Sequence, residues 1–323
     1  MQTTRDIDAP GTKKAAVLES GGLVKHFKKT WQLYTLLLIP IIFLAIFNYY
    51  PMYGAIIAFK DYNIRAGILG SPWADNFGFA NFIRFFGNYN FIETMRNTLW
   101  ISIYSMLVSF PCAIILAISL NYILNVRYKK AVQLISYFPY FISTIILVGM
   151  VNILFNTKTG AIGSIIYSLT GTNVLANASA FPSLYVWSGI WQSVGFNAII
   201  YMAALSGVDM QLHEAATVDG ATILQRIRHI DLPAIIPTAV ILLILNVGGI
   251  LNIGYEKVLA MQNPNNLSAS EIISTYAYKI ALVSSIPDFA YSTAIGLFQS
   301  VVGLVLLLVV NKISRKLTTE SLW

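Results

Sequence analysis

The sequence predicts an all-α integral membrane protein with six membrane-spanning helices and both termini in the cytoplasm. Three observations carry this prediction. Only 11% of the 323 residues are charged and the mean hydropathy is +0.66, whereas about 25% of residues are charged in a typical soluble domain. Six long apolar stretches contain no charged residue, and the basic residues between them are unevenly distributed.

This composition excludes a soluble enzyme, a nucleic-acid-binding protein and a disordered scaffold. Hydrophobic residues make up 56% of the chain. A soluble fold could not bury them all, because more than half of an ordinary protein surface is already apolar. The net charge of +7 is therefore interpreted as a topology signal. The one cysteine, Cys112, lies in an apolar stretch and excludes an internal disulfide.

The spans follow from the thickness of a bilayer. A helix needs about 20 mostly apolar residues to cross the hydrocarbon core. Stretches of this kind predict spans at about residues 31–52, 98–121, 132–156, 183–207, 234–256 and 290–311. A seventh span over residues 161–180 is the alternative, but Asn, Ser, Thr and Gly are frequent in its second half. That composition favours a loop or a short interfacial helix.

Basic residues set the predicted orientation, because Lys and Arg in short loops stay on the cytoplasmic side. With the N-terminus inside, cytoplasmic segments hold 14 of the 21 basic residues, and a seventh span would spoil this bias. The chain then comprises a cytoplasmic segment 1–29, a transmembrane domain 30–316 and a cytoplasmic tail 317–323. The polar first segment is not expected to be a cleaved signal peptide.

The predicted outer segment between the first two spans is rich in aromatic residues. They are Phe77, Phe79, Phe82, Phe85, Phe86 and Tyr89. Two interpretations apply: an interfacial aromatic belt with a small loop core, or a surface that docks an external partner.

Motifs for enzymatic chemistry are absent from the sequence. It has no G-x-x-x-x-G-K-[ST] phosphate loop, so the chain is not expected to hydrolyse ATP. His213 and Glu214 begin an H-E-x-x-H pattern, but Thr217 replaces its second histidine. We expect no catalytic residue, no metal site and no cofactor bound by this chain. The spans hold no charged residue before Glu256, which argues against a proton-coupled carrier.

The predicted cytoplasmic segment 209–233 carries the most informative pattern. It reads Glu214-Ala215-Ala216, three residues, Gly220, nine residues, Ile230, one residue, then Leu232-Pro233. The alternative, a helical linker that only joins two spans, does not explain this spacing.

Local rules predict two short helices at an angle within that segment. Asp209 is expected to cap a helix over 210–218. Gly220 permits a sharp turn, and Asp219 is expected to cap a second helix over 221–229 that Pro233 ends. Ala215 and Ala216 leave one face of the first helix without bulky side chains. Glu214 offers a carboxylate to a partner protein.

The pattern matches the EAA signature, and the chain resembles the permease subunits of binding-protein-dependent ABC importers of type I. Segments 50–54, 58–62, 70–73, 254–257, 263–264 and 292–298 resemble the LplB-type branch, which imports polysaccharides and complex oligosaccharides and includes the alginate-importer permease. The resemblance covers roughly residues 31–316. Two departures are Met210, where members often have Pro, and His213, where they often have Tyr.

The resemblance implies a six-helix permease in a bacterial cytoplasmic membrane that imports complex carbohydrate. The implied partners are a second homologous permease, two ATP-binding subunits that carry ATP and Mg, an extracytoplasmic solute-binding protein and the lipid bilayer, with no nucleic acid. The implied ATPase-coupling residues are Glu214, Ala215, Ala216, Asp219, Gly220, Ile230, Leu232 and Pro233.

Candidate substrate-path residues lie in the outer halves of the fourth and fifth spans. Aromatic faces bind sugar C–H surfaces and amides bind hydroxyls, which selects Trp187, Trp191, Gln192, Asn246, Asn252, Tyr255 and Glu256. Trp187 and Trp191 share one helix face, which we expect to lie opposite Asn246 and Asn252. The alternative is that these side chains anchor the protein at the interface or join helices.

Three other functions remain open from the sequence. The solute of the importer could be something other than a sugar, because the EAA signature marks only ATPase coupling. A secondary transporter with inverted repeats would need broken helices, for which Gly248-Gly249 is the one candidate. A membrane-embedded enzyme would need convergent His, Cys or carboxylate groups, and the sequence shows none.

Overall fold

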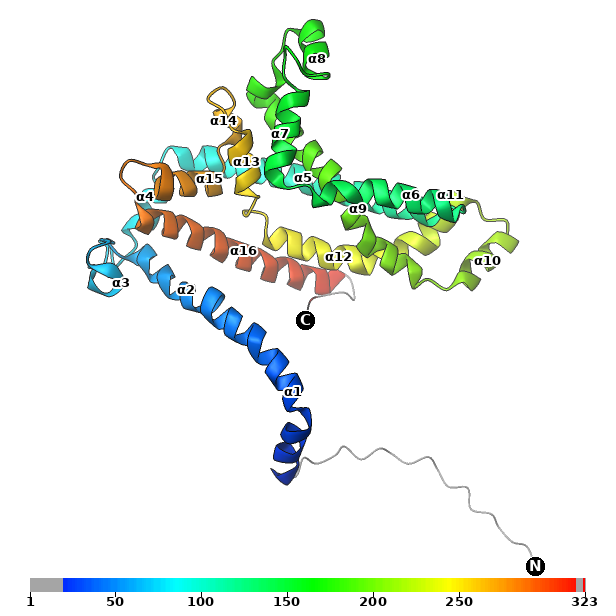
Figure 1. Ribbon diagram of the computed structural model, residues 1–323, viewed down its shortest axis with the longest axis horizontal. Coiled ribbons are helices and arrows are strands. Elements are labelled where there is room, and N and C mark those ends of the chain that lie inside the picture. Colours follow the sequence, from blue (N-terminus) through cyan, green and yellow to red (C-terminus); the bar gives the residue numbers. More distant parts are fainter. Residues whose placement is uncertain (1–19, 318–321, 323) are drawn as a thin grey trace, which may run out of the picture. The chain divides into compact units, whose positions relative to one another are not determined.

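The computed structural model describes residues 20–317 and residue 322, and this part of the chain is built from helices (Figure 1). Its one strand-like pairing is an isolated antiparallel bridge between Lys60 and Trp73. The chain divides into two compact units, Met1–Ala55 and Ile56–Trp323. The all-α prediction is confirmed for the described residues, whereas the first 19 residues and most of the predicted tail lie outside them.

The described part of the first unit, from Ser20 on, is helical with a kink at Thr30. α1 (Ser20–Leu44) continues through a π-helical turn (Ala45–Tyr49) into α2 (Tyr50–Met52). The stretch Thr30–Phe59 is long and apolar enough to cross a membrane, as predicted for the first span.

Four long helices frame the second unit: α5 (Asn90–Asn121), α9 (Phe181–Ser206), α12 (Leu232–Gly248) and α16 (Phe289–Leu317). α5 packs along α9, and α12 packs along α16 and against α9 (Figure 1). Helices without a hydrophobic driving force between them associate through close packing of small residues.

A cluster of buried side chains joins α5, α9 and α12 by close packing of small residues. Three of its members are alanines, Ala113, Ala117 and Ala198, and Tyr201 and Ile235 complete the contact. The small side chains bring the backbones of α5 and α9 close together, which places the polar groups of these helices within reach of one another.

Helix length and composition give four to six candidate spans among the described residues. Four helical stretches qualify alone: Thr30–Phe59, Asn90–Asn121, Ile223–Gly248 and Phe289–Lys316. Two bent pairs qualify only together, with bends of 102° and 73°.

The predicted third span is bent rather than straight. α6 (Val126–Tyr137) runs into a 3-10 turn (Phe138–Phe141), and α7 (Thr144–Leu154) leaves at 102°. Pro139 cannot donate a backbone hydrogen bond, and the Ser143 side chain caps α7 by accepting from the Ile146 amide. A single continuous helix over residues 132–156 is therefore wrong.

The predicted fifth span starts earlier and ends earlier than expected. The helix runs continuously from Ile223 to Gly248, after which the chain turns and begins α13 (Tyr255–Met261). The Gly248-Gly249 pair marks the break, and Tyr255 and Glu256 start a new helix rather than end the span. α14 (Leu267–Ser270), α15 (Ile273–Tyr278) and a π turn (Lys279–Val283) lead to α16.

The outer aromatic segment folds into short helices with a core of its own. They are a 3-10 helix (Tyr53–Phe59), α3 (Gly67–Gly70) and α4 (Ala80–Phe86). Phe59, Phe79 and Phe82 form this local core, with ring centroids 5.3–5.8 Å apart. Phe85 is fully buried but packs into the helix bundle, in a cluster with Tyr291 and Ile295 of α16. The predicted small loop core is thus present, whereas Phe77 and Tyr89 are exposed.

The stretch proposed as a seventh span holds only short elements. α8 (Gly163–Thr170) is followed by 3-10 turns at Val174–Ala176 and Ala178–Ala180. α8 is too short to cross a bilayer, which agrees with the loop or short helix favoured from the sequence.

The contact of α9 with α6 predicts a sharp sensitivity at Gly195. A β-carbon at Gly195 would lie 2.0 Å from the Ser136 carbonyl oxygen, and overpacking of this kind costs about 1–3 kcal/mol. We expect Gly195→Ala to lower the Tm of the detergent-solubilised protein. Gly296→Ala is the control, because a β-carbon there meets nothing within 4 Å. Equal Tm values for the two variants would contradict the contact.

Candidate functional site: a polar cavity and a helical loop

The predicted first helix of the EAA segment forms with the expected bounds. α10 (Met210–Val218) is capped by Asp209, whose Oδ1 accepts a 2.9 Å hydrogen bond from the Gln211 amide. α10 leaves the end of α9 at 73°. It thus projects from the bundle as a separate short helix on a rigid support.

Gly220 makes the turn after α10 in the left-handed region, with φ of +78°. A β-carbon there would meet nothing within 4 Å, so the backbone angle is the constraint at this position. The Ala221 amide donates to the Ala216 carbonyl at 2.8 Å and closes the turn. Asp219 lies at the C-terminal end of α10.

The second helix of the segment differs from the prediction. Thr222, not Asp219, caps α11 (Ile223–Arg226), through a reciprocal pair of hydrogen bonds with Gln225. Pro233 does not end the helix, because a π turn (Ile227–Asp231) leads directly into α12 and places the proline in its first turn. The loop is therefore continuous with a spanning helix.

The segment presents a surface suited to a partner. Glu214 and Ala215 are exposed, and Ala216 and Ile230 are half-buried. A groove of about 370 Å³ runs between the two helices, with Ala216, Asp219, Gly220, Ala221, Gln225, Arg226, His229 and Ile230 along its walls. Pro233 is exposed and Leu232 packs against the helix core.

The base of the segment contains a buried carboxylate that the motif does not mark. Asp231 is fully buried, and its Oδ2 accepts a 2.7 Å hydrogen bond from the Tyr122 hydroxyl at the end of α5. Burial and this hydrogen bond raise the pKa of Tyr122 to about 12, so it stays protonated and remains a donor. The available sequence signal was a single acidic residue between the basic stretch 226–229 and the apolar stretch that starts at Leu232.

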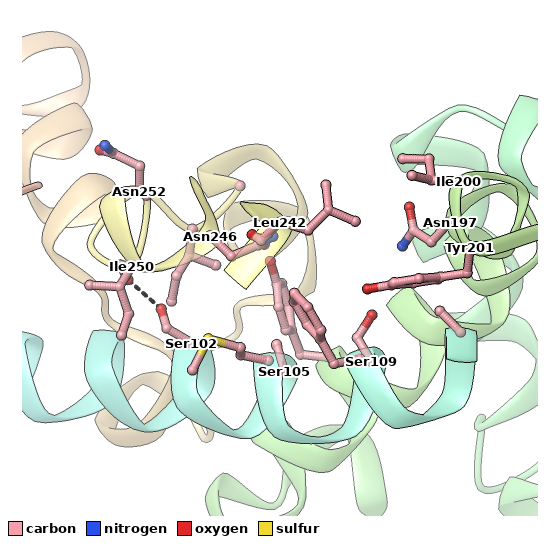
Figure 2. A pocket seen from close by; sticks show the side chains of 17 residues that line it. Ser102, Ser105, Ser109, Asn197, Ile200, Tyr201, Leu242, Asn246, Ile250 and Asn252 are labelled. Atoms are coloured by element: carbon pink, nitrogen blue, oxygen red, sulfur yellow. Dashed lines mark hydrogen bonds between the residues drawn. The ribbon is translucent and has the colours of Figure 1, made fainter. Parts of the chain in front are cut away.

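A polar cavity of about 320 Å³ lies between α5, α9, α12 and the turn after α12 (Figure 2). Its polar lining residues are Ser102, Ser105, Ser109, Tyr185, Asn197, Tyr201, Asn246 and Asn252. The three serines share one face of α5, and α9 and α12 supply amides and phenols across from them. No charged residue lines this cavity within the described chain.

Of the predicted substrate-path residues, the structure brings Asn246 and Asn252 to the cavity. Trp187 and Trp191 do not line it and are 53% and 47% exposed. The Trp187 indole donates to the Tyr104 hydroxyl at 3.1 Å, on another face of α9. The structure thus does not bring the tryptophans into one cavity with the asparagines, and their place on a substrate path stays a prediction.

The remaining predicted path residues also lie outside the cavity lining. Gln192 donates to the Ile142 carbonyl at 2.7 Å and thereby joins α9 to the segment before α7. Tyr255 packs on Tyr278 with ring centroids 5.5 Å apart, and Glu256 is exposed in the first turn of α13. Sequence reasoning missed the serines of α5, although their spacing in an apolar span was a usable signal.

A buried lysine anchors α13 beside the cavity. Lys257 Nζ donates to the Tyr185 carbonyl at 2.8 Å and lies 4.5 Å from the centre of the Tyr185 ring. Gly189 leaves the space, because a β-carbon there would be 3.0 Å from Nζ. Burial lowers the pKa of Lys257 to about 8.

Apolar spanning helices that enclose a polar cavity are the architecture of a membrane transport protein. Residues 109–319 match the family described as the binding-protein-dependent transport system inner membrane component. The chain therefore belongs to this family.

Its relatives include two proteins of Bacillus subtilis strain 168. LplB is 39% identical over 97% of this chain and 99% of its own length. The polygalacturonan/rhamnogalacturonan transport system permease protein YteP is 39% identical over 93% of this chain and 92% of its own length. These relationships confirm the predicted family and a transport component rather than an enzyme.

The fold is shared with a solved transporter. A chain of a bacterial ABC transporter involved in the import of the acidic polysaccharide alginate is 37% identical, with a TM-score of 0.82 over 92% of this chain and 99% of that chain. The same kind of chain, 36% identical, occurs in a complex with an alginate pentasaccharide-bound periplasmic protein. The predicted ABC permease fold is thus confirmed in its architecture.

The cavity geometry predicts which positions water reaches. We expect a water-soluble thiol reagent to modify cysteines placed at Ser105, Asn197 and Asn246 in a Cys112→Ser background, because these residues line the cavity. Leu107→Cys is the control, since Leu107 is 65% exposed on α5 yet lies outside the cavity lining, where lipid or protein covers it. Faster labelling at Leu107 than at Ser105 would contradict the assignment.

Proposed function

We propose that this chain is one permease subunit of a type I ABC importer for oligosaccharides derived from complex polysaccharides. The observation that carries the proposal is the uncharged polar cavity between α5, α9 and α12. Serine, asparagine and tyrosine side chains can each donate and accept hydrogen bonds, as sugar hydroxyls require. The named substrates of YteP and of the alginate transporter support the same class.

The proposed topology has six spans with both termini in the cytoplasm of a bacterial cell. α6 and α7 count as one bent span, and α9 with α10 as another, in which α10 leaves α9 at a 73° bend. The basic residues on the predicted inner side support this orientation.

The proposed assembly pairs this chain with a second homologous permease, two ATP-binding subunits and an extracytoplasmic solute-binding protein. ATP and Mg belong to the ATP-binding subunits. The periplasmic protein bound to the alginate transporter supports the last of these partners. The exposed α10 surface supports docking of an ATP-binding subunit, with Glu214 as a contact and Gly220 as the turn that sets its angle.

Transport then proceeds by alternating access between two states of the importer. Closure of the ATP-binding subunits moves α10, and the motion opens the cavity to the outer side. ATP can shift this equilibrium only by its differential affinity for the two states, a few kcal/mol in such systems.

The substrate class is tested by uptake. An importer complex purified through a tag on this chain and placed in proteoliposomes with its binding protein should take up galacturonan, rhamnogalacturonan or alginate oligosaccharides in an ATP-dependent manner. Asn246→Leu removes a hydrogen-bonding group from the cavity, so we expect uptake at low substrate to fall about 5–10-fold.

The control for that substitution is Asn152→Leu, an exposed asparagine on α7 that does not line the cavity. The importer complex that carries Asn152→Leu should take up the oligosaccharides at the same rate as the unmodified complex. ATP-dependent uptake of only non-sugar solutes would overturn the substrate class but leave the importer assignment intact.

The coupling role is tested at Gly220. Gly220→Val forces a β-branched residue into positive φ, which costs about 1–3 kcal/mol, and should abolish uptake while the complex still assembles. Gly171→Val is the matched control, because Gly171 has φ of +67° and equally open surroundings in the segment after α8. Glu214→Ala should also reduce uptake per ATP hydrolysed. Normal uptake by Gly220→Val at equal expression would refute the role.

A further inference from the structure

Three elements of the proposed coupling machinery meet at one buried carboxylate. Asp231 ends the π turn that joins α11 to α12, Tyr122 follows the last residue of α5, and His213 belongs to α10. Asp231 has no exposed side-chain surface, and only 13% of the His213 side chain is exposed. A carboxylate is rarely buried without partners, because its desolvation costs several kcal/mol.

The two oxygens of Asp231 have different surroundings. Oδ2 accepts the 2.7 Å hydrogen bond from Tyr122, which fixes the start of α12 to the end of α5. Oδ1 is 3.5 Å from His213 Nε2, which is too long for a good hydrogen bond. The contact with α5 is therefore tight, whereas the contact with α10 is loose.

Unsatisfied polar atoms in the described chain concentrate at this point. Two buried side-chain polar atoms there lack a hydrogen-bond partner, Asp231 Oδ1 and Arg226 Nε. Arg226 lies over the Tyr122 ring at 5.7 Å and donates to Thr217 of α10 at 3.0 Å. A buried polar atom without a hydrogen-bond partner is unfavourable, so a conformation that supplies a donor to Oδ1 is favoured locally.

We infer that Asp231 is a positioning residue that receives the movement of α10 and passes it to α12 and α5. This inference rests on the proposed coupling function of α10. Movement of α10 toward α12 shortens the His213–Asp231 contact and completes the hydrogen bonding of Oδ1. The tight Tyr122–Asp231 hydrogen bond then carries the displacement to two helices that line the polar cavity.

Transport per ATP hydrolysed, in the complete importer complex, is the first test. We expect the ratio to fall about tenfold in Asp231→Leu, which removes both contacts, and less in Asp231→Asn, which keeps an acceptor for Tyr122. A role in packing alone would lower assembly of the complex without lowering transport per ATP hydrolysed in the complexes that form. An unchanged ratio in Asp231→Leu would overturn the inference.

Two milder substitutions keep the inference testable if Asp231→Leu fails to assemble. Tyr122→Phe and His213→Ala should each lower the ratio, and the double variant should be less harmful than additive effects predict, because both act through one carboxylate. Tyr128→Phe, an exposed tyrosine on α6, is the matched control. An equal loss in Tyr128→Phe, or full additivity, would refute the proposal.

Spin labels give a readout that does not depend on the identity of the solute. Leu212 on α10 and Ile115 on α5 are both exposed and can carry labels in a Cys112→Ser background. The distance between them should change on trapping with ATP and vanadate, and this change should shrink in Asp231→Leu. If the unmodified complex imports no saccharide, the proposed function fails, whereas the label distances still decide the role of Asp231. An identical change in both proteins would overturn that role.

Discussion

Each backbone amide or carbonyl left unpaired in hydrocarbon costs several kcal/mol, and this constraint explains where the chain can depart from regular helix. The break after α12 is the clearest case, because it frees carbonyl groups at the depth of the polar cavity. Ser102 of α5 donates to the Ile250 carbonyl, and Gln299 of α16 donates to the Leu251 carbonyl. Side chains of two neighbouring helices thus replace the intrahelical hydrogen bonds that the break removes.

The polar cavity follows from the same constraint. Side chains that hydrogen-bond to the free backbone groups of a broken helix must be polar. They can lie only where other helices shield them from lipid. Ser102, which pairs with the break, belongs to the serine face of α5 that lines the cavity. The site and the irregular backbone are therefore two aspects of one arrangement, in which α5, α9 and α12 surround polar groups that lipid could not solvate.

Local chemistry made part of this structure predictable from the sequence. The α10 bounds, the Asp209 cap and the positive φ of Gly220 follow from rules that act within a few residues. The sequence could not show which face of α9 points into the protein, because apolar residues occur on all sides of this helix. The rotation of α9 about its axis is set by its contacts with α5 and α6. The contact of Trp187 with Tyr104 was therefore not foreseen, and the cap at Thr222 was missed because Asp219 offered an equally good local candidate.

The continuity of α12 with the EAA segment links the two sites physically. The sequence rule that proline ends a helix failed at Pro233, because the π turn before it places the proline in the first turn of α12, where its missing N–H removes no α-helical hydrogen bond. The stretch from Ile223 to Gly248 is consequently one helix, about 39 Å long at 1.5 Å per residue. Asn246 lies in the cavity near one end of this helix, and Arg226 and Asp231 contact Tyr122 near the other. Displacement of the end that carries Asp231 is therefore expected to be transmitted along α12 toward the cavity, which gives the proposed import cycle a mechanical path.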